Sequence, residues 1–278
     1  MPPAPTGPTC TCPPTALIDL RVTPATVTLV TRVVAPNPGP YTGPGTNTWI
    51  LDAGPVVGVI DPGPDDDAHL AALDRRLAQR AVGVVLVTHS HPDHLSLAER
   101  FADRHQATVQ RHPALHDGDI VRVGKLNVTV LYTPGHSADH LSFLLAEDGA
   151  VFTGDLILGR GSSMVTYPEG DVAAYIRSLD KLAALQPRML FPGHWDPVPD
   201  AAAKIAEYRR HRLEREAQIL AEVRRGRGTA AELTRRVYGE LEDKLAVAAE
   251  MTMRAHLRKL VEDGAVLEDG ELYEASVH

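Results

Sequence analysis

The chain has 278 residues, which is enough for one large domain or for a large domain and a small one. Its composition of 44% hydrophobic and 23% charged residues is typical of a soluble globular protein. No run of about eighteen apolar residues occurs, so we expect no membrane span, and a net charge of −8 argues against tight nucleic-acid binding by the whole surface.

The first segment, residues 1–15, is rich in Pro and Thr and has neither a basic start nor an apolar core. We therefore expect a disordered lead and no secretory signal. Cys10 and Cys12, the two cysteines of the chain, both lie in this segment and would need two further ligands to form a zinc site. The absence of other cysteines fits a reducing compartment, and we expect a cytoplasmic protein.

Strands and helices alternate from residue 22 to residue 194. Apolar and β-branched runs predict strands over 22–34, 49–54, 56–63, 82–88, 107–112, 119–124, 126–133 and 188–194, and a hairpin over 142–155. Helical spacing of apolar residues predicts helices over 65–80, 95–105 and 171–185. This order indicates an α/β protein whose sheets are covered by helices, and sites in such folds gather at the C-terminal ends of strands.

The pattern changes near residue 200. Helices are predicted over 201–226, 228–239 and 245–264, followed by a hairpin over 265–275 that turns at Asp269-Gly270. Three helices and a hairpin resemble a winged-helix module. We therefore predict a catalytic domain over 16–200 and a small winged-helix-like domain over 201–278.

The motif HSHPDH directly follows the predicted strand 82–88 and supplies His89, His91, Asp93 and His94. Residues two apart in extended backbone point the same way, so His89 and His91 can bind one metal ion. Asp93 and His94 begin the next helix and are turned toward a second position. Imidazole and carboxylate are ligands that zinc accepts.

Three further strand ends offer matching groups: His136 in TPGHSADH, Asp155 in FTGD and His194 in LFPGH. Unpaired histidine or aspartate side chains would be costly to bury at such places, so their convergence implies a metal. Seven protein ligands and a shared water would satisfy two zinc ions.

These motifs resemble those of the metallo-β-lactamase superfamily. The resemblance implies an αββα sandwich with a dinuclear metal site at one edge. It assigns the first metal to His89, His91 and His136, the second to Asp93, His94 and His194, and the bridging position to Asp155. Because β-lactamases typically have cysteine at that position, Asp155 favours hydrolases of the glyoxalase II, nuclease or thioesterase type.

The resemblance extends to the lactamase-beta-2-like subfamily through NPGPYTGPGTNTWIL, ILGRGSSMV and KIAEYRRHRLEREAQIL. The small C-terminal winged-helix-like domain of that subfamily matches the last helices and hairpin. One departure occurs after the last histidine, where PGHWDPV replaces the usual PGHGPV. Trp195 therefore either lines the substrate cleft or packs under the loop.

The implied chemistry is hydrolysis by a hydroxide that bridges two Zn(II) ions, although His and Asp ligands also suit iron or manganese. Asp93 and Asp155 are expected to act in catalysis. His140 would donate to a leaving group or bind a phosphate, unless it is simply bonded to backbone. Asp61 would accept a proton from a ligand histidine, or only form a turn. Ser162, Ser163 and Tyr167 are weaker candidates on the substrate side.

The substrate is open between several classes. The first is single-stranded RNA, cleaved by a phosphodiesterase that uses the basic stretch 209–227 as a strand guide. The second is a small thioester or ester, such as a glutathione or acyl-carrier conjugate. A β-lactamase and a non-catalytic binding protein are further alternatives. From Lys204 to His278, fourteen basic residues face fifteen acidic ones, so we expect no sequence-specific DNA binding. We expect a monomer or a homodimer.

Overall fold

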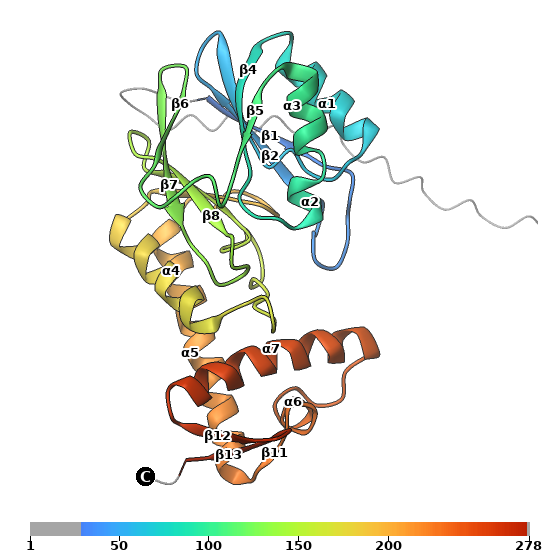
Figure 1. The fold of residues 1–278 in the computed structure, drawn as a ribbon, viewed down its shortest axis with the longest axis vertical. Helices are drawn as coiled ribbons and strands as arrows, with labels where there is room; N and C mark the ends of the chain where they lie inside the picture. Colours follow the sequence, from blue (N-terminus) through green and yellow to red (C-terminus); the bar gives the residue numbers. More distant parts are fainter. Residues whose placement is uncertain (1–28, 277–278) are drawn as a thin grey trace, which may run out of the picture.

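Two five-stranded sheets form the larger part of the protein (Figure 1). The structure is a computed structural model that describes residues 29–276; the predicted lead, Cys10, Cys12 and the start of the strand 22–34 lie outside the described residues. The first sheet has the order β1-β2-β3-β4-β5 and consists of β1 Leu29–Val34, β2 Asn47–Asp52, β3 Val56–Ile60, β4 Ala81–Leu86 and β5 Thr108–Gln110. The second has the order β10-β9-β8-β7-β6 and consists of β6 Ile120–Val123, β7 Leu126–Tyr132, β8 Leu141–Leu145, β9 Ala150–Gly154 and β10 Met189–Pro192.

The two sheets pack face to face on a core of alternating inward-facing residues. The strand β6 shows this alternation, because Val121 and Val123 are buried while the residues before each are exposed. Trp49 of β2 meets Phe191 of β10 edge to face with ring centroids 5.0 Å apart. The antiparallel hairpin β8–β9 and the parallel pairs β3–β4, β4–β5 and β9–β10 bring several strand ends to one edge.

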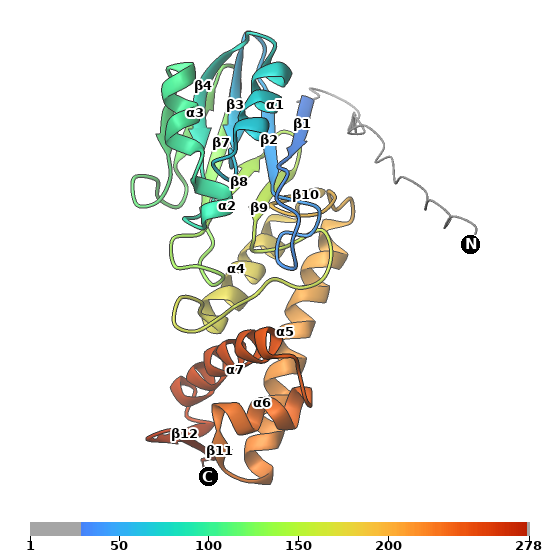
Figure 2. The ribbon, with the colours of Figure 1, turned by 90° about the vertical axis from the view of Figure 1, so that its right-hand side faces the viewer.

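Helices cover both outer faces of this sandwich (Figure 2). The first sheet is covered by α1 Asp67–Leu77 and α3 Ala98–His105, and the second by α4 Val172–Leu185 and the first half of α5 Ala201–Arg225. The segment predicted as one helix over 95–105 belongs to two helices. Leu95 ends the short helix α2 Pro92–Leu95, and α3 begins at Ala98. The predicted αββα sandwich is confirmed.

The C-terminal part is formed by α5, α6 Ala230–Tyr238, α7 Asp243–Glu262 and a small sheet. The sheet contains β12 Val266–Asp269 and β13 Leu272–Ala275, as predicted, and also the two-residue strand β11 Gly228–Thr229, which was not. A capping box between Thr229 and Glu232 starts α6. Within residues 29–276, no helix has both the length and the apolar character needed to cross a membrane.

The helix α5 belongs to two cores. Ile205 and Tyr208 pack with the second sheet and α4, whereas Ile219 and Val223 pack with α6, α7 and β13. The predicted division at residue 200 thus falls at the start of a helix that both parts share.

A buried histidine of α7 should make stability depend on pH. His256 is fully buried, and neither ring nitrogen has a hydrogen-bond partner within residues 29–276. Burial, together with the charges of Arg212 and Arg215, lowers its pKa from 6.5 to about 3. Between these pH values the unfolded chain binds a proton that the folded chain excludes, so stability is lost as the pH falls.

We therefore expect the free energy of unfolding to drop by about 2 kcal/mol more between pH 7 and pH 5 in the parent chain than in His256→Leu. Urea unfolding at both pH values measures this difference. An equal drop in the two proteins would contradict it.

Candidate metal centre

The seven predicted ligand residues lie together at the edge where the strand ends meet. They form two groups, and within each group the candidate ligand atoms lie within 4.8 Å of one another. One group contains His89, His91, His136 and Asp155, and the other contains Asp93, His94 and His194. The HSHPDH segment follows β4, and its Pro92 occupies the first turn of α2, where a proline is favourable. This start of the helix places Asp93 and His94 in the second group, with the His94 ring centroid 4.3 Å from that of His89.

Three imidazoles converge in the first group. The Nδ1 atom of His91 lies 3.0 Å from Nε2 of His89 and 3.1 Å from Nε2 of His136. A single proton on His91 can satisfy only one of these nitrogens, whereas a cation can accept all three lone pairs.

Asp155 reaches both groups. Its Oδ2 atom lies 3.8 Å from Nε2 of His136 and 3.4 Å from Nε2 of His194, and its Oδ1 lies 3.4 Å from Nε2 of His94. In the second group, Oδ2 of Asp93 lies 3.3 Å from Nε2 of His194. Both Asp155 Oδ1 and His94 Nε2 are buried and lack a hydrogen-bond partner within residues 29–276. Such orphaned atoms, aimed at one another, fit a bound metal.

The partly buried carboxylates of Asp93 and Asp155 are stabilised in their ionised form by nearby positive charge. Burial opposes ionisation of Asp155, but His194 and His94 hold the pKa of its carboxyl well below its usual range. Burial also opposes ionisation of Asp93, and its hydrogen bond with His194 outweighs this and brings its pKa to about 2. Conversely, Asp155 overcomes the effect of burial and raises the pKa of His194 to about 9. A divalent cation would stabilise the ionised carboxylates in the same way.

The histidines are fixed by acceptors on the side away from the cluster. Asp61 is buried and accepts hydrogen bonds from the backbone N–H and the hydroxyl of Thr88, at 2.7 and 2.8 Å, and its Oδ2 lies 2.9 Å from Nδ1 of His94. The contact predicted between Asp61 and a ligand histidine is therefore present. Nδ1 of His136 lies 2.7 Å from the carbonyl oxygen of Met164, and each such contact leaves Nε2 facing the cluster.

Glycines allow the strand ends to approach closely. A Cβ atom on Gly193 would lie 2.6 Å from both Oδ1 of Asp155 and Cε1 of His94. Gly154 has a φ of +46°, and a Cβ there would lie 2.7 Å from the hydroxyl of Thr88. The glycines before His194 and Asp155 are thus required by space at both positions and by backbone conformation at Gly154.

The prediction that His140 contacts substrate is wrong. His140 is fully buried, its Nδ1 lies 3.0 Å from the hydroxyl of Thr133, and its Nε2 accepts a hydrogen bond of 3.2 Å from the backbone N–H of Asp155. Burial lowers its pKa well below the usual value, so the ring is neutral. His140 acts as a support behind Asp155, with no free nitrogen for a substrate.

The remaining candidates divide between the site and its surroundings. The hydroxyl of Ser163 donates to the carbonyl oxygen of Asp155 and is buried, while Ser162 is exposed beside it. The backbone N–H of Tyr167 donates to the carbonyl oxygen of Met251 in α7, and Arg258 lies over its ring. The side chain is partly exposed, and its role toward a substrate stays a prediction.

Trp195 packs against the loop that follows β1. Its ring lies so close to Gly43 that a Cβ there would come within 2.4 Å of it, and Arg160 covers the ring at 5.4 Å. Its carbonyl oxygen accepts a hydrogen bond from the side chain of Asn47. Of the two alternatives for Trp195, the structure shows packing under the loop.

Some supporting contacts had no signal in the sequence. The hydroxyl of Thr46 donates to Oδ2 of Asp93 at 3.1 Å, and Glu169 lies 3.3 Å from Nε2 of His91. The carbonyl oxygen of Gly45 lies 3.3 Å from Nδ1 of His194. These groups come from irregular loops, where no spacing rule links them to the strand ends.

Comparison with known proteins agrees with this geometry. The sequence matches the family described as Metallo-beta-lactamase superfamily over residues 41–117 and 111–194, and the Beta-lactamase associated winged helix domain over 229–274. A Beta-lactamase-like protein 2 homolog of Caenorhabditis elegans is 31% identical over 256 residues, which is 85% of each chain. An Atrochrysone carboxyl ACP thioesterase of Aspergillus chevalieri is 34% identical over 266 residues, covering 88% of this chain and 84% of the relative.

Solved structures show the same fold. The crystal structure of a Beta-lactamase domain protein from Burkholderia ambifaria superposes with a TM-score of 0.79 at 23% identity, covering 94% of this chain and 95% of that one. The chain therefore belongs to the metallo-beta-lactamase superfamily and carries the winged helix domain associated with it.

Proposed function

We propose that this superfamily hydrolase is a dinuclear, zinc-dependent enzyme that cleaves thioesters. The observation that carries the proposal is the position of Asp155, whose two oxygens face histidines of both groups at 3.4 to 3.8 Å. Two divalent ions held there would supply a water of lowered pKa and a Lewis acid for the scissile carbonyl.

The residues of the chain have separate tasks in this proposal. His89, His91 and His136 would hold one ion, Asp93, His94 and His194 the other, and Asp155 would hold both. Asp61 keeps the His94 ring turned so that Nε2 faces the site, and His140 fixes the backbone of Asp155. This outer ring of hydrogen bonds keeps the ligands in place before any substrate arrives.

A thioester is favoured over RNA because four of the six arginines of α5 between residues 209 and 225 are paired or buried, including Arg210, which pairs with Glu214 at 3.7 Å. Arg209 pairs with Asp180 at 2.6 Å, Arg225 pairs with Glu222 at 2.6 Å, and Arg212 is buried. Binding of a strand needs several cations that neutralise successive phosphates. The similarity to an acyl-carrier thioesterase supports the same choice.

A substrate panel tests the proposal. The purified, metal-loaded protein is assayed against N-acetylcysteamine thioesters, labelled single-stranded RNA and bis(p-nitrophenyl) phosphate. We expect turnover of the thioesters, loss of that turnover with EDTA, recovery with Zn(II), and about two metal ions per chain by elemental analysis.

Preferential cleavage of RNA would instead assign a phosphodiesterase, and turnover that survives complete chelation would reject the metal-dependent mechanism. Recovery with Fe(II) or Mn(II) but not with Zn(II) would reject only the choice of metal.

A further inference from the structure

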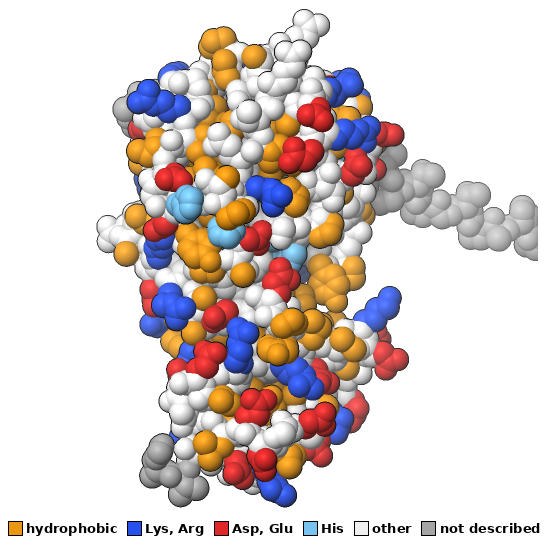
Figure 3. Space-filling model, in the orientation of Figure 1, with side chains coloured by type: hydrophobic (Ala, Val, Ile, Leu, Met, Phe, Trp, Pro, Cys, Tyr) orange, Lys and Arg blue, Asp and Glu red, His pale blue; other side chains and the backbone are white. Residues whose placement is uncertain are grey.

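A cavity of about 370 Å³ lies where the catalytic sandwich meets the winged helix domain. We call it the junction groove. It is lined by Tyr41, Ser162, Ser163, Met164, His211, Arg212, Arg215, Tyr238, Leu241, Leu245, Ala248, Ala249 and Thr252. On the face drawn in Figure 3, histidines lie across the middle of the molecule and hydrophobic side chains lie directly below them.

The junction groove borders the candidate metal centre. The carbonyl oxygen of Met164 contacts Nδ1 of His136 at 2.7 Å, and the hydroxyl of Ser163 donates to the carbonyl oxygen of Asp155. One short segment thus forms the wall of the groove with one side and supports the metal ligands with the other. The groove therefore lies directly beside the candidate metal centre, on the Nδ1 side of His136.

The lining of the groove is apolar with a positive charge at one place. It contains no Asp or Glu. Arg212 is already used, because it is buried, donates to the carbonyl oxygen of Ser163 and lies 5.0 Å over the ring of Tyr175. Arg215 lies 4.4 Å over the ring of Tyr238, and no carboxylate within residues 29–276 pairs with it.

The lining of the junction groove also contains a buried polar atom that lacks a hydrogen-bond partner. Nδ1 of His211 is buried and has no hydrogen-bond partner in the described part of the chain. Two large hydrophobic residues of the same lining, Leu245 and Tyr41, are 53% and 57% exposed. An apolar ligand that fills the junction groove would cover both side chains.

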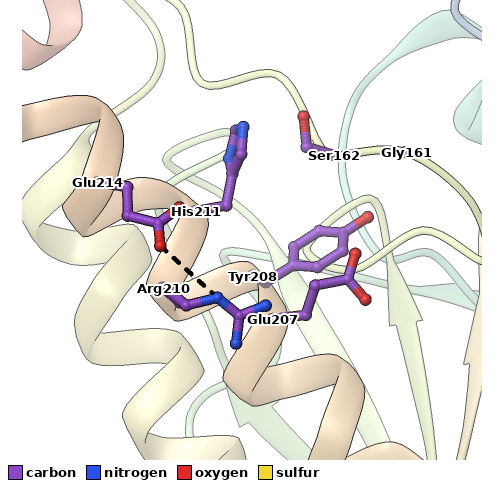
Figure 4. A pocket seen from close by; sticks show the side chains of 7 residues that line it. All are labelled: Gly161, Ser162, Glu207, Tyr208, Arg210, His211 and Glu214. Atoms are coloured by element: carbon purple, nitrogen blue, oxygen red, sulfur yellow. Dashed lines mark ion pairs between the residues drawn. The ribbon is translucent and has the colours of Figure 1, made fainter. Parts of the chain in front are cut away.

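The hollow on the other side of His211 has a different character. Figure 4 shows it lined by Glu207, Arg210 and Glu214, with Arg210 paired to Glu214 at 3.7 Å. The carboxylates of Glu207 and Glu214 would repel an anionic ligand from this hollow. Of the two cavities, the junction groove is therefore the better site for a carboxylate.

We propose that the junction groove binds the acyl part of the substrate and that Arg215 binds a carboxylate at the far end of that acyl group. This inference rests on the proposed thioesterase function and narrows it to acyl groups that carry an acid. A guanidinium that lies over an aromatic ring and pairs with no carboxylate has N–H donors available for a ligand carboxylate. The apolar wall would bury the methylenes between that carboxylate and the thioester.

Two thioesters that differ only at the end of the acyl chain test the proposal. N-acetylcysteamine thioesters of adipic acid and hexanoic acid have equal chain lengths, and only the first has a terminal carboxylate. We expect a higher kcat/KM for the adipoyl thioester. Arg215→Gln should raise its KM about tenfold, with kcat nearly unchanged, and should change the KM of the hexanoyl thioester much less. Arg215→Lys should restore part of the preference.

The matched control is Arg224→Gln, the same change at an exposed arginine near the end of α5, outside the groove lining. It should leave both thioesters unchanged. If the parent chain hydrolyses both thioesters equally and Arg215→Gln changes neither, the inference is overturned while the thioesterase function stands.

If neither thioester is hydrolysed, the proposed function fails, and binding decides the inference separately. Calorimetry is then done with the adipoyl amide in which nitrogen replaces the thioester sulfur. Weaker binding to Arg215→Gln than to the parent chain and to Arg224→Gln supports the groove site. Absent binding, or equal binding to all three proteins, overturns it.

Discussion

Replacement of Asp155 by asparagine is expected to abolish hydrolysis and to lower the metal content of the purified protein. The loss of activity should exceed the roughly 10-fold to 100-fold effect of removing an outer partner of a metal ligand. The reason is that Asp155 faces His136, His94 and His194 at once. Asparagine keeps the shape of the side chain but removes the charge that would hold two cations.

Turnover by Asp155→Asn is measured on the best substrate of the panel, together with elemental analysis and thermal melting. The fold should survive, because the backbone N–H of residue 155 can still donate to His140. Asp180→Asn is the matched control, because Asp180 is exposed and its one ion pair within residues 29–276 is with Arg209 on the surface. Undiminished turnover of Asp155→Asn with two bound ions would rule out a bridging role.

Replacement of Asp61 by alanine is expected to lower the free energy of unfolding by about 3 kcal/mol or more. The carboxylate accepts three buried hydrogen bonds, two from Thr88 and one from Nδ1 of His94. Removing it leaves the backbone N–H of Thr88 and Nδ1 of His94 without a partner, and leaves the hydroxyl of Thr88 with its 2.9 Å contact to Nδ1 of His89. Alanine would also be strained at this position, where φ is +51°, whereas aspartate and asparagine tolerate that conformation.

The same change should weaken metal binding about 10-fold to 100-fold, because His94 loses the contact that orients it. Denaturant unfolding of the metal-free protein separates the effect on stability from the effect on metal affinity, which is measured by competition with a chelator. Asp61→Asn should be less damaging in both assays. A change of less than about 1 kcal/mol in the alanine variant would show that water replaces the carboxylate.

The ligand set could be predicted because each member stands at or within three residues of the end of a predicted strand, or at the start of the next helix. Asp93 and His94 are an example, since Pro92 starts a helix that carries both residues. His140 shows the limit of this approach. Its position four residues after His136 does not reveal that the chain turns its ring beneath Asp155.

Contacts supplied by irregular loops could not be predicted. The hydroxyl of Thr46 and the carboxylate of Glu169 reach the cluster only through the folded paths of their loops. The division of the chain shows a related limit, because the buried face of α5 runs from one core into the other. Nothing in its spacing distinguishes Ile205, which packs on the sandwich, from Ile219, which packs on the winged helix domain.

The shared helix α5 has a consequence for how the chain can tolerate length changes. Each residue of an α-helix advances the axis by about 1.5 Å and turns it by about 100°. One residue inserted between Tyr208 and Ile219 would therefore rotate the winged helix domain out of phase with the sandwich and carry Tyr238 and Leu245 away from Met164. The loop at 239–242, which joins α6 to α7, imposes no such phase. A change of length in this loop would shift Leu241 of the groove lining without rotating the domain, whereas a change of length in α5 would rotate it.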